Sequence, residues 1–460
     1  MVEALTIASR LPEAFWRKTA PEAVSAPTWV LQNVALAAQL NLPPDVFARS
    51  ETLAALSGNG PWGEFQPVAL AYSGHQFGGW NPLMGDGRAH LIATLPGDFE
   101  LQLKGSGPTP FSRNGDGRAA LGPMLREYIV SEAMAGLGIP TTRSLAVVAT
   151  GEQVYRRRRE PGAIVARIAK SHVRVGSFQF AAAHLGKTGV EALYEHERQR
   201  SHPHTDDVRG FLASAISRQA TLIAQWMCVG FIHGVMNTDN MAISGETIDY
   251  GPCAFLDVFH PKKVFSSIDE YGRYAWDQQP AIGLWNLTRF AEALLQLLDD
   301  DSDRAVAVAK LELEKFYPQF EEAFEAAMLR KLGILDRRED DGAFIADVLK
   351  VLMDEKLDFT LFFRALTRGV DVSTAASAMW RKRLAGVEPD MKVMQQVNPV
   401  YIARNHQVEA ALREAEDGNL ERCHRLLSLL KNPYTEQDDM AGFEAGPLPD
   451  EEVSQTFCGT

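Results

Sequence analysis

The chain has 460 residues, 46% of them hydrophobic and 23% charged, with a formal net charge of −13. This composition is typical of a folded globular protein and argues against extensive disorder. The acidic balance argues against a general nucleic-acid-binding protein, because affinity for the phosphate backbone needs an excess of Lys and Arg on one surface. We therefore expect no nucleic-acid partner.

The sequence also limits where the protein works. No apolar run is long enough to span a bilayer, and residues 1–18 lack the basic start and apolar centre of a secretory signal. We expect a cytoplasmic monomer with no membrane partner. The cysteines are too few and too scattered to predict a disulfide framework or a zinc site; they are Cys228, Cys253, Cys423 and Cys458.

Residues 1–68 mix short apolar patches with prolines and show no clear period, so we interpret them as an N-terminal extension. Residues 69–190 form the next predicted unit, which opens with glycine-rich turns. A hairpin is predicted where Pro96-Gly97-Asp98 separates two strand-like runs. Apolar residues at helical spacing then predict a helix over 119–137. The predicted strands are 90–95, 100–104, 144–149, 154–156 and 163–169.

Residues 191–300 are predicted to be mainly helical around a loop. Apolar residues recur at helical spacing over 211–231 and predict a long buried helix. A tight hairpin with Ile243 and Ile248 as its flanks is expected to lead into Asp249-Tyr250-Gly251. Residues 301–460 are read as a helical C-terminal region. The helical patterns beyond Trp285 cover 287–298, 305–327 and 343–353.

The order of these parts is that of a protein kinase: glycine-rich turn, strand ending in Lys, helix with Glu, long helix, His-containing loop, then Asp-x-Gly. Lys104 would place a positive charge at nucleotide phosphates, and Glu127 on the following helix could hold its ammonium group. We therefore predict a protein-kinase-like two-lobed α+β fold with an N-terminal extension and additional C-terminal helices.

The loop from His233 to Asn240 departs from the kinase pattern at one position. In that pattern the catalytic base stands two residues after the His and a metal-binding Asn stands seven after it. Here Asn240 has the metal position, but Val235 has the base position and cannot accept a proton. Asp239 is the only carboxylate in this loop. Asn240 and Asp249 offer the oxygen ligands that Mg²⁺ prefers.

Four motifs together strongly resemble the selenoprotein O family, also called YdiU-like. The resemblance covers residues 70–290 and continues more loosely to the C-terminus. Its members are pseudokinases that bind ATP in a flipped orientation and transfer AMP to Ser, Thr or Tyr hydroxyls of proteins. The motifs are Tyr72-Ser73-Gly74-His75-Gln76-Phe77-Gly78, Gly85-Asp86-Gly87-Arg88, Leu103-Lys104-Gly105-Ser106-Gly107-Pro108-Thr109-Pro110-Phe111-Ser112-Arg113 and Asn237-Thr238-Asp239-Asn240.

The resemblance implies a role for each candidate site residue. Asp239 would be the catalytic base, Asn240 and Asp249 would hold Mg²⁺ or Mn²⁺, and Glu127 would support Lys104. The implied ATP contacts are Gly85, Gly87, Arg88, Lys104, Asp116, Gly117, Arg167, Arg174 and Asp249. This is coherent chemistry, because attack at the α-phosphorus expels pyrophosphate and several cations must hold the β and γ groups. Residues 100–174 supply them, with 12 Lys or Arg against 6 Asp or Glu.

The family carries selenocysteine or cysteine third from the C-terminus, and Cys458 has that position here. The resemblance therefore implies a possible redox role for Cys458. In some members this residue pairs with a cysteine after the Asp-x-Gly turn. The segment 263–271 contains no cysteine, and Cys253 is the only nearby candidate.

Three other functions remain open from the sequence. The same fold could transfer UMP from UTP with Mn²⁺, because the base-binding pocket cannot be read from these motifs. A catalytically silent nucleotide-binding scaffold would explain Val235, although the joint presence of Lys104, Glu127, Asn240 and Asp249 favours an enzyme. A conventional kinase ranks last because of Val235.

Overall fold

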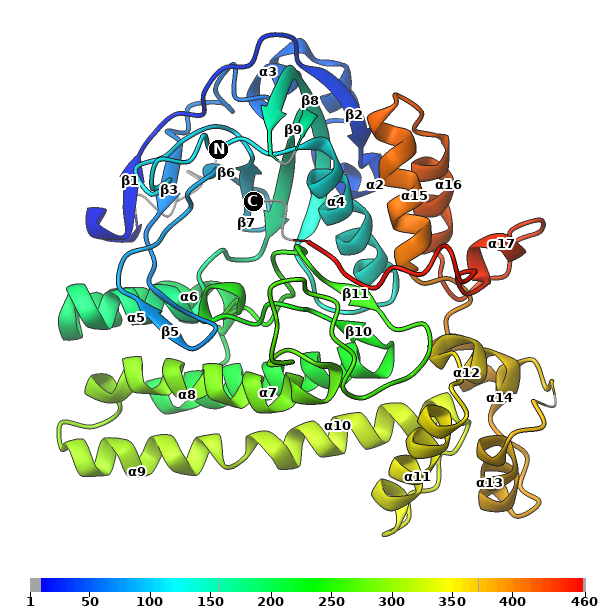
Figure 1. The fold of residues 1–460 in the computed structure, drawn as a ribbon. Coiled ribbons are helices and arrows are strands. Elements are labelled where there is room, and N and C mark those ends of the chain that lie inside the picture. The colour runs from blue at the N-terminus through cyan, green and yellow to red at the C-terminus, as the bar shows by residue number, and fades with distance from the viewer. Residues whose placement is uncertain (1–9, 157, 371, 458–460) are drawn as a thin grey trace.

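The computed structural model describes residues 10–156, 158–370 and 372–457. Within these residues, an antiparallel seven-stranded sheet with the order β1-β3-β6-β7-β9-β8-β2 lies over a layer of helices (Figure 1). Its strands are β1 (Trp16–Lys18), β2 (Thr28–Gln32), β3 (Val68–Leu70), β6 (Ala89–Leu95), β7 (Phe99–Lys104), β8 (Arg143–Tyr155) and β9 (Arg159–Ala169). Two short ribbons pair β4 (Gly74–Gln76) with β5 (Gly79–Asn81) and β10 (Phe231–Ile232) with β11 (Ala254–Phe255).

The helices fall into three groups. Close to the sheet lie α2 (Val34–Gln39), α3 (Ser50–Leu56) and α4 (Leu121–Gly136). The layer below contains α5 (Val175–His184), α6 (Gly186–Ser201), α7 (Val208–Cys228), α8 (Gln279–Leu298), α9 (Ser302–Leu313) and α10 (Phe316–Lys331). The C-terminal group comprises α11 (Asp341–Asp354), α12 (Phe359–Thr367), α13 (Ala375–Leu384), α14 (Met391–Val397), α15 (Asn405–Glu416), α16 (Glu421–Leu430) and α17 (Ala441–Glu444).

The two faces of the sheet pack against different cores. Leu101 and Leu103 of β7 belong to a core that also contains Leu36 of α2 and Leu56 of α3. The opposite face packs on α4 and joins the large core of the helical layer. Because side chains alternate along a strand, the residues between these leucines face α4.

This alternation brings two predicted site residues onto one face. Gln102 and Lys104 of β7 lie on the side of the sheet that faces α4. Arg167 of β9 lies on the same side, since its neighbours Ala166 and Ile168 belong to the core on the opposite side. Arg167 is the register partner of Gln102. Lys104 and Arg167 are therefore diagonal neighbours, a spacing at which long side chains can act together.

The mixed helix-and-sheet class is confirmed, as are the hairpin of β6 and β7, the helix α4 and most of the long helix, now α7. One strand prediction was wrong: 144–149 and 154–156 are parts of the single strand β8. A register shift between Ala149 and Gln153 absorbs the intervening residues as a bulge. The predicted helix 305–327 is two helices, α9 and α10. Pro318 lies in the first turn of α10, where its missing N–H is tolerated.

The tight hairpin predicted around Ser244 is also absent from the described structure. Ala242 instead pairs with Arg174, and Thr247 pairs with Thr141. The Glu246 carboxylate accepts hydrogen bonds from the Lys170 backbone N–H and from the Ser244 hydroxyl. The local pattern failed here because the backbone partners come from distant parts of the chain.

The N-terminal residues contribute directly to the sheet. β1 pairs with β3 at one edge, and β2 pairs with β8 at the other. Residues 16–32 thus provide both edge strands, although their sequence showed no strand period. The boundaries of the four predicted units remain predictions.

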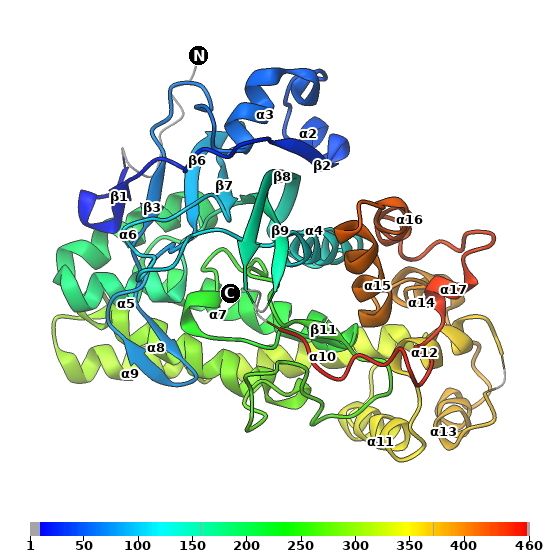
Figure 2. The same ribbon diagram turned by 45° about the horizontal axis from the view of Figure 1, so that its top comes forward.

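The C-terminal chain returns to the sheet after α14. Figures 1 and 2 both show α15 and α16 beside α4, and the last segment crosses back toward the centre of the molecule. At its end, Thr456 forms a parallel bridge with Ser266, and its hydroxyl donates to the Pro252 carbonyl. Thr456, near the end of the described chain, therefore lies beside the segment that follows Asp249.

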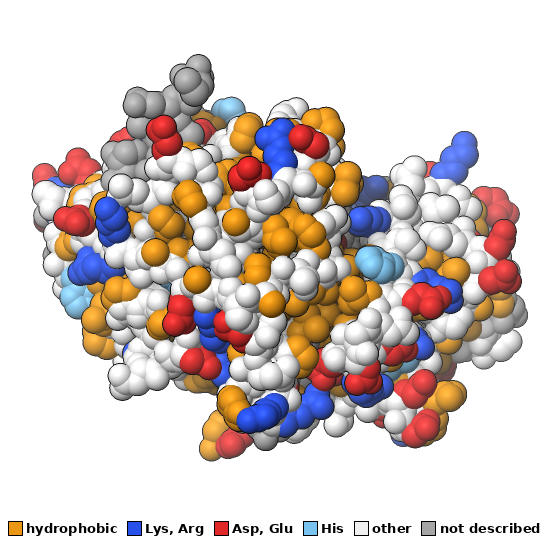
Figure 3. All heavy atoms as spheres, turned by 90° about the horizontal axis from the view of Figure 1, so that it is seen from above, with side chains coloured by type: hydrophobic (Ala, Val, Ile, Leu, Met, Phe, Trp, Pro, Cys, Tyr) orange, Lys and Arg blue, Asp and Glu red, His pale blue; other side chains and the backbone are white. Residues whose placement is uncertain are grey.

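Seen from above, acidic and basic side chains are interspersed, and neither sign covers a broad area of this face (Figure 3). Among the helices of the described residues, none combines the length and apolar character needed to cross a membrane.

Candidate active site

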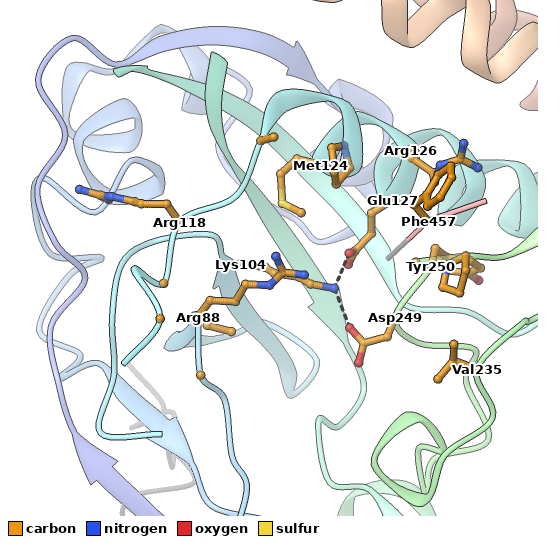
Figure 4. Close-up of a pocket in the computed structure, with 18 of the residues that line it drawn as sticks. Arg88, Lys104, Arg118, Met124, Arg126, Glu127, Val235, Asp249, Tyr250 and Phe457 are labelled. Carbon is orange, nitrogen blue, oxygen red and sulfur yellow. Dashed lines mark hydrogen bonds and ion pairs between the residues drawn. The ribbon is translucent and has the colours of Figure 1, made fainter. Parts of the chain in front are cut away.

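A cavity of about 1090 Å³ lies between the sheet and the helical layer. Its walls come from the glycine turns before β6, the loop between β7 and α4, the strands β7 and β9, the loop 235–252 and helix α15. Lys104 lies between Glu127 and Asp249 at its centre, and Arg88 extends toward the same place, whereas Arg118 points away (Figure 4). All the predicted ATP and metal contacts line this cavity: Gly85, Gly87, Arg88, Lys104, Asp116, Gly117, Arg167, Arg174, Asn240 and Asp249.

Three cations surround one carboxylate in this cavity. Asp249 Oδ1 accepts from Lys104 Nζ at 2.7 Å and from Arg167 Nη2 at 2.6 Å, while Oδ2 lies 3.0 Å from Arg174 Nη1. Glu127 also contacts Lys104 at 2.7 Å and Arg167 at 2.5 Å. The predicted Lys104–Glu127 pair is therefore present in the structure as part of a larger network.

These cations set the charge of the two acids. Burial alone would raise the pKa of Asp249, but Arg167, Lys104 and Arg174 outweigh it and hold that pKa well below its usual range. The pKa of Glu127 is lowered in the same way, with burial opposed by Arg167 and Lys104. Both groups are anionic at neutral pH. Three cations thus converge on one part of the cavity, which Arg88 also lines, and this arrangement suits a polyphosphate.

Asp239 differs from these acids because, among the described residues, no Lys or Arg forms an ion pair with its carboxylate. The residue is buried, and its Oδ1 has no hydrogen-bond partner among the described residues. Arg174 Nη1 donates instead to the Asp239 backbone carbonyl at 2.8 Å. Burial raises the pKa of Asp239 to about 6, although Arg174 lowers it in part. A buried carboxylate with an unused oxygen can accept a proton from a bound hydroxyl group.

The rest of the loop holds this carboxylate in place. His233 Nε2 contacts the Ile248 carbonyl at 2.9 Å, which ties the loop to the strand-like segment before Asp249. Asn240 Nδ2 donates to the Val235 carbonyl at 2.9 Å. Val235 itself lines the cavity, so the kinase base position faces the site with an apolar side chain.

The oxygen donors fit a hard divalent cation. Asp249 is ionised, Asn240 carries an amide oxygen, and both line the same cavity next to the unpartnered oxygen of Asp239. Within the described part of the chain, no group of three or more His, Cys, Asp or Glu side chains could hold a metal by itself. A magnesium or manganese ion would need further ligands from nucleotide phosphates and water, as Mg²⁺ commonly does.

The glycines allow the backbone to approach closely. A Cβ on Gly85 would overlap the Phe111 ring, and a Cβ on Gly117 would overlap the backbone of Gly107. Gly117 also has a φ of +64°, which a side chain rarely adopts. Its neighbour Asp116 forms a two-point ion pair with Arg156 at 2.8 and 2.9 Å. Asp116 is thus engaged by a cation at the rim of the cavity.

Sequence reasoning missed some members of the site. Asp86 is buried, and its carboxylate accepts from Gln102 Nε2 at 2.9 Å and lies 3.8 Å from Arg174 Nη2. Tyr72 stacks its ring on the Arg174 guanidinium at 4.9 Å. Asp86 lies between Gly85 and Gly87 in one of the four motifs of the sequence, and that position could have indicated that it belongs to the site. Cys458, the predicted redox residue, lies outside the described residues, and Cys253 is buried.

Comparison with known proteins identifies the family. Residues 3–382 match the family described as "Protein adenylyltransferase SelO". The chain belongs to the SelO family. Its relatives extend this likeness to the whole chain. A "Protein nucleotidyltransferase YdiU" of Nitrobacter hamburgensis is 46% identical over 98% of this chain and 95% of its own length. Proteins of the same name are 48% identical in Bradyrhizobium sp. (strain ORS 278), over 98% of this chain and 97% of the relative, and 47% identical in Methylorubrum populi, over 98% of each.

Membership of the SelO family supports nucleotidyltransferase activity for this chain. The α15 residues Glu409, Leu412, Arg413 and Glu416 line the cavity although they lie beyond the matched residues 3–382. The identity with relatives over 98% of the chain includes this helix. The roles of the individual site residues remain predictions.

Proposed function

We propose that this chain is a protein adenylyltransferase that transfers AMP from ATP to Ser, Thr or Tyr hydroxyls of proteins, on a fold of the protein-kinase type. The observation that carries the proposal is the buried carboxylate of Asp239, which lines the same cavity as the cation cluster of Lys104, Arg167 and Arg174 and whose Oδ1 has no hydrogen-bond partner among the described residues. The proposed base of this loop is Asp239, next to the cations. The position that carries the base in kinases is instead Val235.

The proposed reaction needs each part of the site. The acceptor oxygen attacks the α-phosphorus and forms a new P–O bond while the bond from that phosphorus to pyrophosphate breaks. The acceptor proton passes to the Asp239 carboxylate, which lines the cavity. Lys104, Arg167 and Arg174 stabilise the charge that develops on the leaving pyrophosphate, since fixed cations in a shielded cavity act strongly on such charge.

Asn240 and Asp249 are the proposed holders of Mg²⁺ or Mn²⁺. When bound there, the ion would act as a Lewis acid on the phosphate oxygens. Glu127 keeps the Lys104 ammonium in position at 2.7 Å. Arg174 orients the base loop through the Asp239 carbonyl while it contacts Asp249. The proposed base and the proposed metal ligand Asp249 are therefore both held by Arg174.

The test is label transfer from ATP to protein, with the label at either the α- or the γ-phosphate and with Mg²⁺ or Mn²⁺ present. We expect covalent label from the α position alone. Asp239→Asn should reduce this labelling about 100-fold or more, the usual effect of losing a general base. The variant should still bind ATP. Asp300→Asn is the matched control, because Asp300 is exposed on the remote helical side.

Other outcomes would replace the proposal with a different function. Label from the γ position alone would make the protein a kinase. Transfer from α-labelled UTP with Mn²⁺, at a higher rate than from ATP, would make it a uridylyltransferase. Nucleotide binding without any transfer would indicate a scaffold.

A further inference from the structure

A second cavity of about 580 Å³ adjoins the candidate active site. It is lined by Phe77 from the β4–β5 ribbon and by residues of the segment 268–282. Ile268 lines both cavities, and the neighbours Gln76 and Phe77 line the first and second respectively. The two spaces therefore meet along Ile268 and the ribbon.

Apolar side chains remain exposed around this second cavity. Tyr271 is 95% exposed, Ile268 50% and Phe77 39%. The turn that carries Tyr271 is nevertheless ordered by hydrogen bonds. The Asp269 carboxylate accepts from the backbone N–H groups of Arg273 at 2.9 Å and Tyr274 at 2.8 Å. An ordered turn that displays exposed apolar side chains next to a cavity is typical of a binding surface.

Both walls of the cavity are attached to the base loop. Asn237 Oδ1 accepts from the Phe77 backbone N–H at 3.0 Å and from the Tyr274 hydroxyl at 2.6 Å. At the other end of β4, Gly74 packs against Asp239. Because a strand rises about 3.3 Å per residue, Phe77 lies about 10 Å along the ribbon from the base. That length corresponds to about three residues of an extended chain.

The charges around the second cavity do not suit a second polyphosphate. Asp269 and Glu270 are acidic, and the one basic residue of its lining, Arg273, lies over the Trp285 ring at 5.0 Å. The cation cluster that suits phosphates lies in the first cavity. An occupant of the second cavity should therefore be an apolar group that reaches the first cavity at one end.

We propose that the second cavity binds the acceptor protein. An extended segment of the acceptor would place its hydroxyl at Asp239 and an aromatic or large aliphatic side chain, about three residues away, against Phe77, Ile268 and Tyr271. This inference rests on the proposed transfer to protein hydroxyls. It adds a sequence preference to that transfer.

The test uses synthetic peptides with one central Ser in a background of Gly, Ala and Lys. A single Phe is moved along the peptide one position at a time, and label from α-labelled ATP is measured. We expect kcat/KM to be about tenfold higher when Phe lies about three residues from the Ser, the effect of partly burying one aromatic ring.

The preference should disappear in Tyr271→Ala, which should still bind ATP with unchanged affinity. Tyr317→Ala on α10 is the matched control, since Tyr317 is also an exposed tyrosine but lines neither cavity, and it should keep the preference.

Two results would overturn the inference, and they have different consequences for the proposed function. If the wild type labels proteins but labels all peptides alike, or if Tyr271→Ala keeps the Phe preference, the acceptor does not bind here and the proposed function stands. If the wild type transfers no label to any acceptor, the proposed function fails and this inference fails with it.

Discussion

At the scale of single residues, Asp249 is the carboxylate on which three cations depend. Lys104, Arg167 and Arg174 all contact it, and its backbone has a φ of +63°. Loss of its charge would leave Lys104 and Arg167 with Glu127, and Arg174 with Asp86 at 3.8 Å, as their remaining counter-ions. Removal of one partner from a buried ion network is strongly destabilising, because the remaining charges are left desolvated.

We therefore predict that Asp249→Asn lowers the free energy of unfolding by about 3 kcal/mol, in addition to abolishing nucleotidyl transfer. Urea denaturation of the nucleotide-free protein measures this change. The exposed control Asp300→Asn should be unaffected. An Asp249→Asn variant as stable as the wild type would mean that the cations find other partners.

A second residue prediction concerns pH. Glu197 is buried away from the candidate active site, and its two oxygens accept from Ser171 Oγ at 2.6 Å and Ser201 Oγ at 3.0 Å. Burial raises its pKa from 4.5 to about 7, and the nearby His196 is neutral because burial lowers its pKa to about 4. The folded state thus keeps a proton on Glu197 that the unfolded state releases. The contribution of Glu197 to stability should therefore fall as pH rises from 4.5 to about 7 and then level off.

Glu197→Gln mimics the protonated acid and should remove part of this pH dependence. At pH values above the folded pKa it should be more stable than the wild type, by on the order of 3 kcal/mol. Glu246, whose pKa burial also raises to about 7, contributes in the same direction, whereas His90, His196 and His202, whose pKa burial lowers to about 4, contribute in the opposite direction and are unchanged in the variant. Thermal unfolding across this pH range is the measurement, with Glu421→Gln as an exposed control. Equal slopes in wild type and Glu197→Gln would contradict the prediction.

At the scale of elements, the loop between β7 and α4 depends on a backbone approach at Gly117. Gly117→Ala would force a Cβ into the Gly107 backbone as well as impose a left-handed conformation on Ala. Gly138→Ala imposes the same conformation, but its Cβ would meet nothing within 4 Å. A comparison of Gly117→Ala with Gly138→Ala therefore separates the effect of backbone strain from the effect of steric overlap.

We expect Gly138→Ala to cost about 1 kcal/mol of stability and to leave nucleotide affinity unchanged. Gly117→Ala should cost more and should weaken ATP binding about tenfold or more, because the displaced loop lines the cavity. Isothermal titration with ATP measures the affinity of both variants. Equal affinities would mean that this loop does not contact the nucleotide.

The same elements show what the sequence could predict. Lys104, Glu127 and Asp249 were predicted as one site, because their order and spacing follow a recurring catalytic pattern. Strand alternation then explains why Arg167 joins Lys104, although that pairing depends on the register of β7 and β9. Asp86 escaped notice because its role comes from contact with Gln102 and Arg174, both distant in sequence.

The failures at element scale have the same cause. The supposed hairpin around Ser244 has backbone partners at Thr141 and Arg174, far from it in the chain. β1 and β2 are strands because β3 and β8 offer free edges, and their own residues show little strand period. Local pattern was sufficient for α4 and α7, whose apolar faces are continuous, and it failed where distant segments decide the structure.

At the scale of the whole molecule, the C-terminal helices support the helix that carries Glu127. Arg126 of α4 pairs with Glu409 of α15, and the Tyr434 hydroxyl donates to the Leu137 carbonyl at 3.1 Å. Gly136 packs directly against the Leu430 carbonyl of α16. The position of Glu127 therefore depends on segments near the other end of the chain.

This contact makes an unusual prediction for a glycine in a helix. Gly to Ala normally stabilises a helix by up to about 1 kcal/mol, but Gly136→Ala should destabilise the protein by about 2 kcal/mol, because its Cβ would overlap the Leu430 carbonyl. Gly122→Ala in the same helix is the control, since its nearest neighbour is the Glu416 side chain, and it should not destabilise the protein. Urea denaturation distinguishes the two, and stabilisation by Gly136→Ala would show that α16 can move away.

The two edge strands of the sheet have a consequence for assembly. β1 and β2 both come from residues 16–32, yet they cover opposite edges. A chain that lacks this segment would expose β3 at one edge and β8 at the other, and these edges are not equivalent. A contact between two unlike edges is heterologous, so copies would add head to tail, and such a series stays open unless its rotation closes a ring. Loss of these residues should thus give open-ended polymers, visible as light scattering that grows with concentration, instead of a closed dimer.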